Sequence, residues 1–161
     1  MKAVLLSIRP EWCAKICSGV KTVEVRKTYP KLETPFKCYI YKTLPKSGDW
    51  NDTDGRIIGE FVCDRITPLH NICTDDWKML AGGLHNIEKE LVNQACLTEA
   101  QLHTYAGGKN CFAWHISDLK IYEQPRKLEE FAGIRTMKNG FELRLLDRAP
   151  QSWCYVAEGQ R

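Results

Sequence analysis

LSIRPEWCAKICSGVKTVEVRK, residues 6–27, predicts the end of a strand, a short helix and the beginning of a second strand. Pro10 suits the first position of a helix, because its missing N–H would be unpaired there in any case. Glu11 places a carboxylate in the positively polarised first turn of that helix. Gly19 can adopt the left-handed conformation that ends a helix. A helix from Pro10 to about Ser18 is therefore expected.

The residues after this helix alternate in polarity. Val23 and Val25 are predicted to face one side of a strand, whereas Thr22, Glu24 and Arg26 face the other. Lys21 stands at the entrance of the same strand, so four polar or charged side chains crowd beside an apolar face. This arrangement is typical of the wall of a polar cleft.

The rest of the chain is predicted to form one α+β domain over residues 1–161, without repeats, low-complexity tracts or linkers. Helices are expected from Thr74, over 87–95, and from the capping box formed by Thr98 and Gln101 to the glycines at 107 and 108. Turn-forming residues predict an irregular loop over 44–55. Further strands are expected over 36–42, 56–66, 111–121, 142–146 and 154–156.

Five motifs in the chain resemble the ASCH domain, a member of the PUA-like superfamily. The first is the stretch quoted above, with its Ser-Ile-Arg-Pro-Glu and its Ser-Gly-Val-Lys-Thr-Val-Glu-Val-Arg-Lys segments. The others are Pro35–Tyr41, Gly59–Asp64, Trp114–Leu119 and Pro150–Tyr155. They follow the order expected of the family and span nearly the whole chain. The resemblance implies a small, mixed PUA-like β-barrel with flanking helices and a cleft that binds RNA or modified nucleosides.

Composition places the protein among globular proteins without a membrane span. Its 161 residues are 43% hydrophobic and 27% charged, and no apolar run reaches the roughly 18 residues of a spanning helix. The first residues lack the pattern of a signal peptide, so a cytoplasmic location is expected. Eight cysteines are spread singly with no Cys-x-x-Cys pair, which predicts structural thiols, with Cys13 and Cys17 packed inward, and neither a metal site nor a cofactor.

Positive charge is concentrated at the amino-terminal end of the chain. Residues 1–31 carry a net charge of +5, and the remaining 130 residues carry −2. A local basic patch favours contact with phosphate groups, whereas proteins that bind polyanions along their whole surface are usually far more basic. We assign Lys21, Arg26 and Lys27 to this contact.

Three residues are candidates for acid–base chemistry: Lys21, Glu24 and Glu60. A partly desolvated lysine near a carboxylate can exchange protons if its pKa falls. Some bacterial ASCH proteins are amidohydrolases of N4-acylated cytidine that use a Lys-Thr-x-Thr-x-Arg segment. Lys21, Thr22 and Arg26 match this segment, but Glu24 replaces its second threonine, the proposed nucleophile. A carboxylate can instead hold a water as general base.

Other residues are candidates for binding a nucleic acid or nucleotide. Aromatic rings can stack on bases, hydroxyl and amide groups can read base edges, and backbone N–H groups at a helix start favour phosphate. The candidates of this kind are Ser7, Arg9, Thr22, Arg26, Lys27, Tyr41, Gln151, Ser152 and Trp153.

Three functions follow from these motifs and side chains. The first is a module that binds RNA or a modified nucleoside or nucleotide in a basic cleft flanked by aromatic residues. The second is an amidohydrolase of N4-acylated cytidine-type nucleosides, with Lys21 acting together with Glu24 or with a Glu60 that faces the cleft. The third is a metal-independent ribonuclease, an activity that the resemblance also implies.

Overall fold

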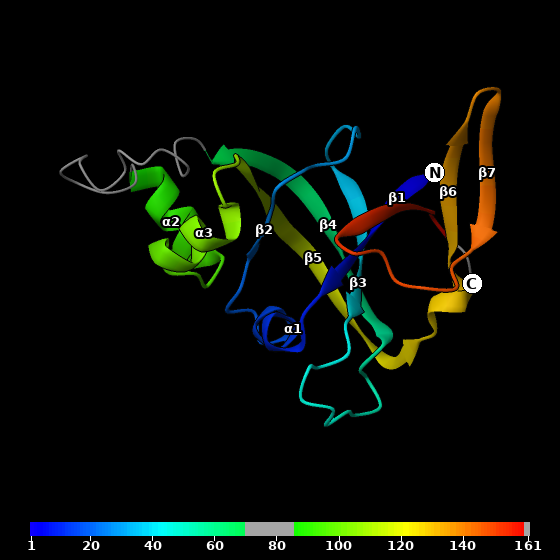
Figure 1. The fold of residues 1–161 in the computed structure, drawn as a ribbon, viewed down its shortest axis with the longest axis horizontal. Coiled ribbons are helices and arrows are strands. Elements are labelled where there is room, and N and C mark those ends of the chain that lie inside the picture. Colours follow the sequence, from blue (N-terminus) through cyan, green and yellow to red (C-terminus); the bar gives the residue numbers. More distant parts are fainter. Residues whose placement is uncertain (70–85, 160–161) are drawn as a thin grey trace.

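The computed structural model describes residues 1–69 and 86–159 and has a mixed α+β architecture (Figure 1). Its helices are α1 (Pro10–Cys17), α2 (Asn86–Gln94), α3 (Glu99–Ala106) and a 3₁₀ turn, η2 (Leu128–Glu130). Its strands are β1 (Lys2–Ile8), β2 (Val23–Arg26), β3 (Phe36–Lys42), β4 (Arg56–Leu69), β5 (Cys111–Arg126), β6 (Ala132–Met137), β7 (Gly140–Leu145) and β8 (Trp153–Ala157). No helix in the described ranges is long and apolar enough to cross a membrane.

All eight strands belong to one sheet with the order β2-β5-β4-β3-β1-β8-β6-β7. β1 and β3 are parallel, and the other ladders are antiparallel. Within residues 1–69 and 86–159 no ladder joins β2 to β7, so the sheet is not closed into the barrel that the sequence predicted. The α+β class is confirmed, but the sheet is strongly curved and open.

Two strands are longer than expected, and one further strand was not expected. β4 continues through Pro68 and β5 continues to Arg126, and β6 was not predicted at all. Pro68 is tolerated because the ladder between β3 and β4 ends at the pair of Phe36 with Cys63, which leaves β4 with β5 as its neighbour at Pro68. The helix expected from Thr74 lies outside the described residues.

Helix α1 begins and ends as predicted. Pro10 occupies its first turn, and Gly19 follows it with a φ of +75°. Cys13 and Ile16 on this helix pack inside the curve of the sheet with the apolar residues Val4, Leu6, Ile8, Phe36, Cys38, Ile40, Ile58, Phe61, Cys63 and Trp114. Cys17, in contrast, is exposed, so the prediction that both helix cysteines face inward was wrong for this one.

Two other clusters cover the outer face of the sheet. Helices α2 and α3 pack against Val23 and Val25 of β2 and Ala113 of β5. At the other end, Phe131 and Leu128 pack against β1, β3 and β4. The valines of β2 therefore face the helices, as predicted from their alternation, which leaves Glu24 and Arg26 on the concave side.

Candidate functional site

Three charged side chains are buried together where β2 meets the concave side of the sheet. Lys21 is 3% exposed, and Glu24 and Arg26 are each 7% exposed. The Glu24 carboxylate lies between the two cations, with Oε2 3.2 Å from Lys21 Nζ and Oε1 2.9 Å from an Arg26 terminal nitrogen. The cluster keeps one net positive charge. We call Lys21, Glu24 and Arg26 the buried charge cluster.

No ladder in the described residues joins β2 to β1 or to β8, and the Arg26 side chain connects them. One terminal nitrogen donates to the carbonyl oxygen of Ser7, in β1, at 2.8 Å. The other donates to the carbonyl oxygen and the hydroxyl of Ser152, just before β8, at 3.2 and 3.3 Å. The Arg26 side chain therefore bridges the gap between β2 on one side and β1 and β8 on the other. We call this gap the seam.

Two buried N–H donors on this concave side have no acceptor among the described residues. One is Arg26 Nε, and the other is the indole N–H of Trp114, which lies opposite Glu24 in the ladder between β2 and β5. Buried donors are nearly always paired in proteins. Both donors are buried, so they are unpaired polar groups inside the protein next to the buried charge cluster.

Lys21 is held by three acceptors. Its Nζ donates to the carbonyl oxygens of Val23 and Ala95, both at 2.8 Å, and also contacts Glu24. Because Ala95 follows α2, these bonds tie the start of β2 to the helices. The ammonium also lies 5.2 Å from the centre of the Trp12 ring. All three ammonium protons thus have a partner, which is the pattern of a cation that positions its neighbours.

Aromatic rings extend the site toward β8. The indole N–H of Trp153 donates to the Thr28 hydroxyl at 2.9 Å, and its ring lies 6.1 Å from that of Trp114 and 5.3 Å from that of Tyr155. The bond between Trp153 and Thr28 is a second link across the seam. Gln151, beside them, is exposed.

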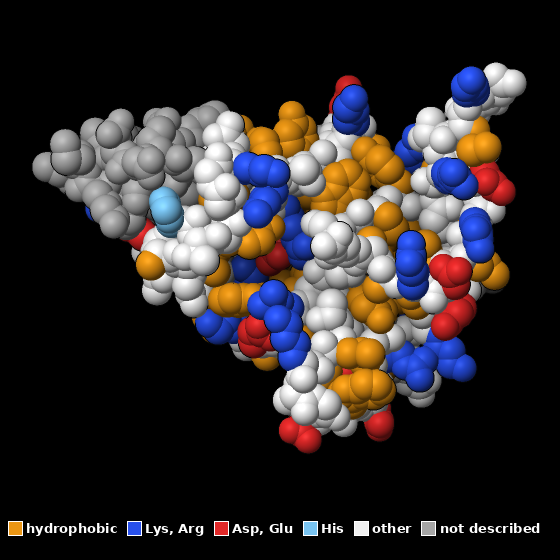
Figure 2. Space-filling view, in the orientation of Figure 1, with side chains coloured by type: hydrophobic (Ala, Val, Ile, Leu, Met, Phe, Trp, Pro, Cys, Tyr) orange, Lys and Arg blue, Asp and Glu red, His pale blue; other side chains and the backbone are white. Residues whose placement is uncertain are grey.

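Exposed basic residues surround this region. Arg9 precedes α1, and Lys27 follows Arg26 with its Nζ 5.2 Å from the centre of the Tyr105 ring on α3. Thr22 is also exposed. Figure 2 shows Lys and Arg side chains over β2 and between α3 and α1. Positive potential on this face suits an anionic ligand.

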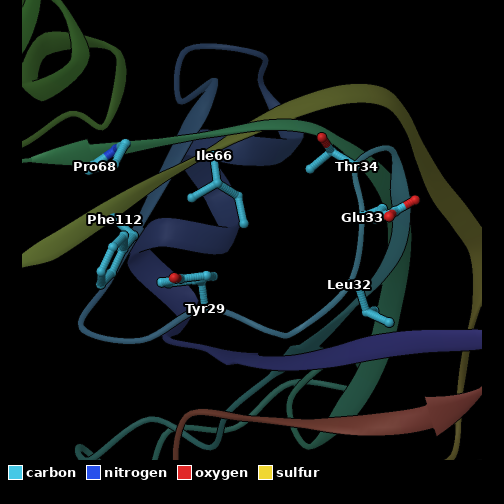
Figure 3. A pocket seen from close by; sticks show the side chains of 7 residues that line it. All are labelled: Tyr29, Leu32, Glu33, Thr34, Ile66, Pro68 and Phe112. Carbon is cyan, nitrogen blue, oxygen red and sulfur yellow. The ribbon is translucent and has the colours of Figure 1, made fainter.

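An open cavity of about 560 Å³ lies at the end of β2 (Figure 3). Tyr29 and Phe112 line one side, with their ring centres 4.5 Å apart, and Leu32, Glu33 and Thr34 line the other. Phe112, which lines the cavity, pairs with Arg26 in the ladder between β2 and β5, although no residue of the buried charge cluster lines the cavity itself. Sequence reasoning missed Tyr29 and Phe112, although Phe112 shares a strand face with Trp114 and could have been found by that alternation.

Two predicted site residues lie on the opposite face of the sheet. Glu60 contacts Lys37 at 3.4 Å and accepts a hydrogen bond from Tyr122. Tyr41 packs beside the same outer cluster as Tyr122. Burial acts to raise the pKa of Glu60, but the Tyr122 hydroxyl and the Lys37 charge outweigh it and lower this pKa below its ordinary value. Because Glu60 lies on the opposite face of the sheet, it pairs with Lys37 and not with Lys21.

Ser7 contributes through its backbone. Its hydroxyl donates to the carbonyl oxygen of Pro150 at 2.6 Å, while its carbonyl oxygen accepts from Arg26. The structure thus brings together Lys21, Glu24, Arg26, Ser7, Ser152 and Trp153, and separates Glu60 and Tyr41 from them.

No protein-family model matches the sequence, and no curated protein sequence matches it significantly. The structure is similar to the crystal structure of ASCH from Zymomonas mobilis, with a TM-score of 0.58 and 22% identity over 97% of this chain and 88% of that chain. Crystal structures of a tyrosine-to-phenylalanine and a serine-to-alanine mutant of ASCH from Zymomonas mobilis give TM-scores of 0.57 and 0.54, with 23% and 22% identity. They cover 98% and 97% of this chain, and 92% and 89% of those chains. The resemblance found in the sequence motifs is confirmed at the level of structure: the chain has the fold of ASCH domain proteins.

Proposed function

We propose that the protein binds RNA or a modified nucleotide at the concave side of the sheet, over the buried charge cluster. The observation that carries this proposal is the burial of two cations around one carboxylate, beside an aromatic-lined cavity. Burying charges costs free energy, so a buried cluster of this kind beside a cavity is a candidate for a functional site.

The exposed cations Arg9 and Lys27 provide the electrostatic part of the binding. Contacts to phosphate release counterions, so affinity for RNA should fall as salt rises. Trp153 and the pair of Tyr29 with Phe112 provide ring surfaces, and stacking contributes about 1–3 kcal/mol per base.

Fluorescence anisotropy of a labelled, short single-stranded RNA over a series of salt concentrations tests the proposal. Lys27→Glu and Arg9→Glu are expected to weaken binding and to reduce the slope of log affinity against log salt by about one or more. Lys138→Glu is the matched control, because Lys138 is also an exposed lysine but lies on the turn between β6 and β7. Binding that is absent, independent of salt or equally weakened in the control would contradict the proposal.

Hydrolysis of an N4-acylated cytidine is the second candidate, because Lys21 and Glu24 are in direct contact. Incubation with N4-acetylcytidine, followed by chromatography for released cytidine, tests it. Turnover that disappears in Lys21→Ala would establish an amidohydrolase. No turnover by the wild type would leave the binding function, because the three acceptors around Lys21 favour a positioning role.

The third candidate, a ribonuclease, is separated from binding by following the length of the RNA on a gel. Intact RNA after prolonged incubation agrees with a binding module. Cleavage that persists in the presence of a chelator would identify a metal-independent ribonuclease.

A further inference from the structure

The outer edge of β7 is an open end of the sheet. β7 pairs with β6 on one side, and none of the described strands pairs with it on the other. β6 in turn is joined to β8 at one position, the pair of Gly133 with Val156. The hairpin of β6 and β7 therefore extends from the body of the molecule as an arm (Figure 1).

One face of this arm is apolar. Phe141, Leu143 and Leu145 alternate along β7 and are 66%, 49% and 61% exposed. Leu143 lies opposite Ile134, and Leu145 lies opposite Ala132, in the ladder with β6. Exposed, apolar edge strands attract another strand, and proteins usually protect them with charged side chains, lysine above all, with proline or with a bulge. β7 carries neither lysine nor proline.

The other face of β7 carries Glu142 and Arg144, which makes the strand complementary to itself. When the β7 strands of two copies pair antiparallel, their apolar residues lie opposite each other only if the twofold axis passes through a residue and not between two residues. An axis at Glu142 puts two glutamates opposite each other, and an axis at Arg144 does the same with two arginines. An axis at Leu143 instead places Glu142 opposite Arg144 twice.

The same register also matches the apolar face. Phe141 of each copy lies opposite Leu145 of the other, and the two Leu143 side chains meet at the axis. Opposite charges and large apolar residues in directly opposed positions each stabilise a strand pair. Charge and hydrophobic pattern therefore select a single register.

We propose that β7 is the interface of a symmetric dimer, in which the β7 strands of two copies pair antiparallel with the twofold axis at Leu143. The two sheets continue into each other across this axis. The interface is short, so the dimer is expected to be weak and dependent on concentration.

Sedimentation velocity over a wide range of protein concentrations measures the association. The wild type should shift from monomer to dimer as concentration rises. Glu142→Arg and Arg144→Glu each put like charges opposite each other twice and should weaken the dimer by at least about tenfold. The double variant that combines them restores two opposite-charge pairs and should restore dimerisation.

The double variant separates this interface from effects inside one chain. Within one chain, Glu142 lies opposite Arg135, and the double variant still places two positive charges at that pair. Recovery therefore requires the contact between copies. Two results would overturn the proposal. One is a wild type that stays monomeric at every concentration, which would leave the edge for some other chain. The other is a double variant that dimerises as weakly as the single variants.

Disulfide trapping tests the register directly. Leu143→Cys should form a covalent dimer under mild oxidation, because the residue lies opposite itself. Phe141→Cys and Leu145→Cys should each fail alone but cross-link when mixed. All three are made in a Cys17→Ser background, since Cys17 is exposed. Equal cross-linking at all three positions would exclude this register.

Discussion

Arg26 joins two parts of the chain that no ladder connects. Its planar guanidinium reaches Ser7 and Ser152 from two separate nitrogens, whereas a lysine presents a single nitrogen on a shorter head group. We expect Arg26→Lys to lower the free energy of unfolding by about 2–3 kcal/mol, since two or three hydrogen bonds of about 1 kcal/mol each are lost. Urea denaturation measures this, with Arg135→Lys on exposed β6 as the unaffected control. Equal stability of Arg26→Lys and wild type would show that the Arg26 guanidinium does not hold β2 against β1 and β8.

The pair of Tyr122 and Glu60 predicts a dependence of stability on pH. The lowered pKa of Glu60 stabilises the folded state above the unfolded value of about 4.5, and this stabilisation is lost as pH falls through the folded value. Tyr122→Phe should therefore cost about 1–2 kcal/mol near neutral pH and progressively less in acid.

Urea denaturation at several pH values checks this expectation. Tyr29→Phe is the control, because this tyrosine is exposed, its ring packs on Phe112, and no hydrogen bond from its hydroxyl to a carboxylate is formed within residues 1–69 and 86–159. A cost of Tyr122→Phe that stays constant from neutral pH into acid would mean that the hydroxyl does not act through Glu60.

At the scale of elements, β4 and β5 approach so closely that one position excludes a side chain. A Cβ at Gly59 would lie 2.5 Å from the carbonyl oxygen of Lys120 and 3.2 Å from the Cα of Ile121. These are backbone atoms of the neighbouring strand, which cannot rotate aside. Gly59→Ala is expected to destabilise the protein by about 2 kcal/mol or more.

Gly19→Ala is the matched comparison for this variant. Gly19 has a positive φ, but no atom lies within 4 Å of the position that an alanine methyl group would occupy. Strain of the left-handed backbone alone should therefore cost about 1 kcal/mol. Thermal unfolding of both variants ranks them. A larger loss at Gly19 than at Gly59 would mean that strand approach is not the dominant constraint.

Local signals in the sequence predicted several elements correctly. The capping box of Thr98 and Gln101 is formed, and the alternation of β2 places Val25 outward and Glu24 inward. Such signals depend on neighbours in the chain. β6 has no such local signal. Most of its residues are exposed, so their polarity does not alternate, and β6 is a strand because it pairs with β7.

The candidate site was less predictable for the same reason. Alternation fixes which residues of one strand share a face, but not which faces of different strands meet. Lys21, Glu24 and Arg26 lie close in the chain, and the structure brings their side chains into contact. Glu60 and Tyr41 lie on β4 and β3, where the curvature of the whole sheet decides which side is concave, and they turned out to face away.

At the scale of the whole molecule, the two ends of the sheet have opposite properties. β2 is covered by α2 and α3 and is bridged to Ser7 and Ser152 by Arg26. β7 is exposed at all its residues. Stability within a protein follows such differences, since segments with few buried contacts open without global unfolding.

Native-state hydrogen exchange should therefore show different amide exchange mechanisms for the strands at the two ends of the sheet. In dilute protein, amides of β6 and β7 are expected to exchange through local opening, with little dependence on low urea, whereas those of β1 and β3 exchange only through global unfolding. β2 belongs with the stable group only while Arg26 bridges the seam, so Arg26→Lys should move β2, and not β3, toward fast exchange. If β2 stays as protected as β3 in this variant, packing of α2 and α3 alone holds that end of the sheet.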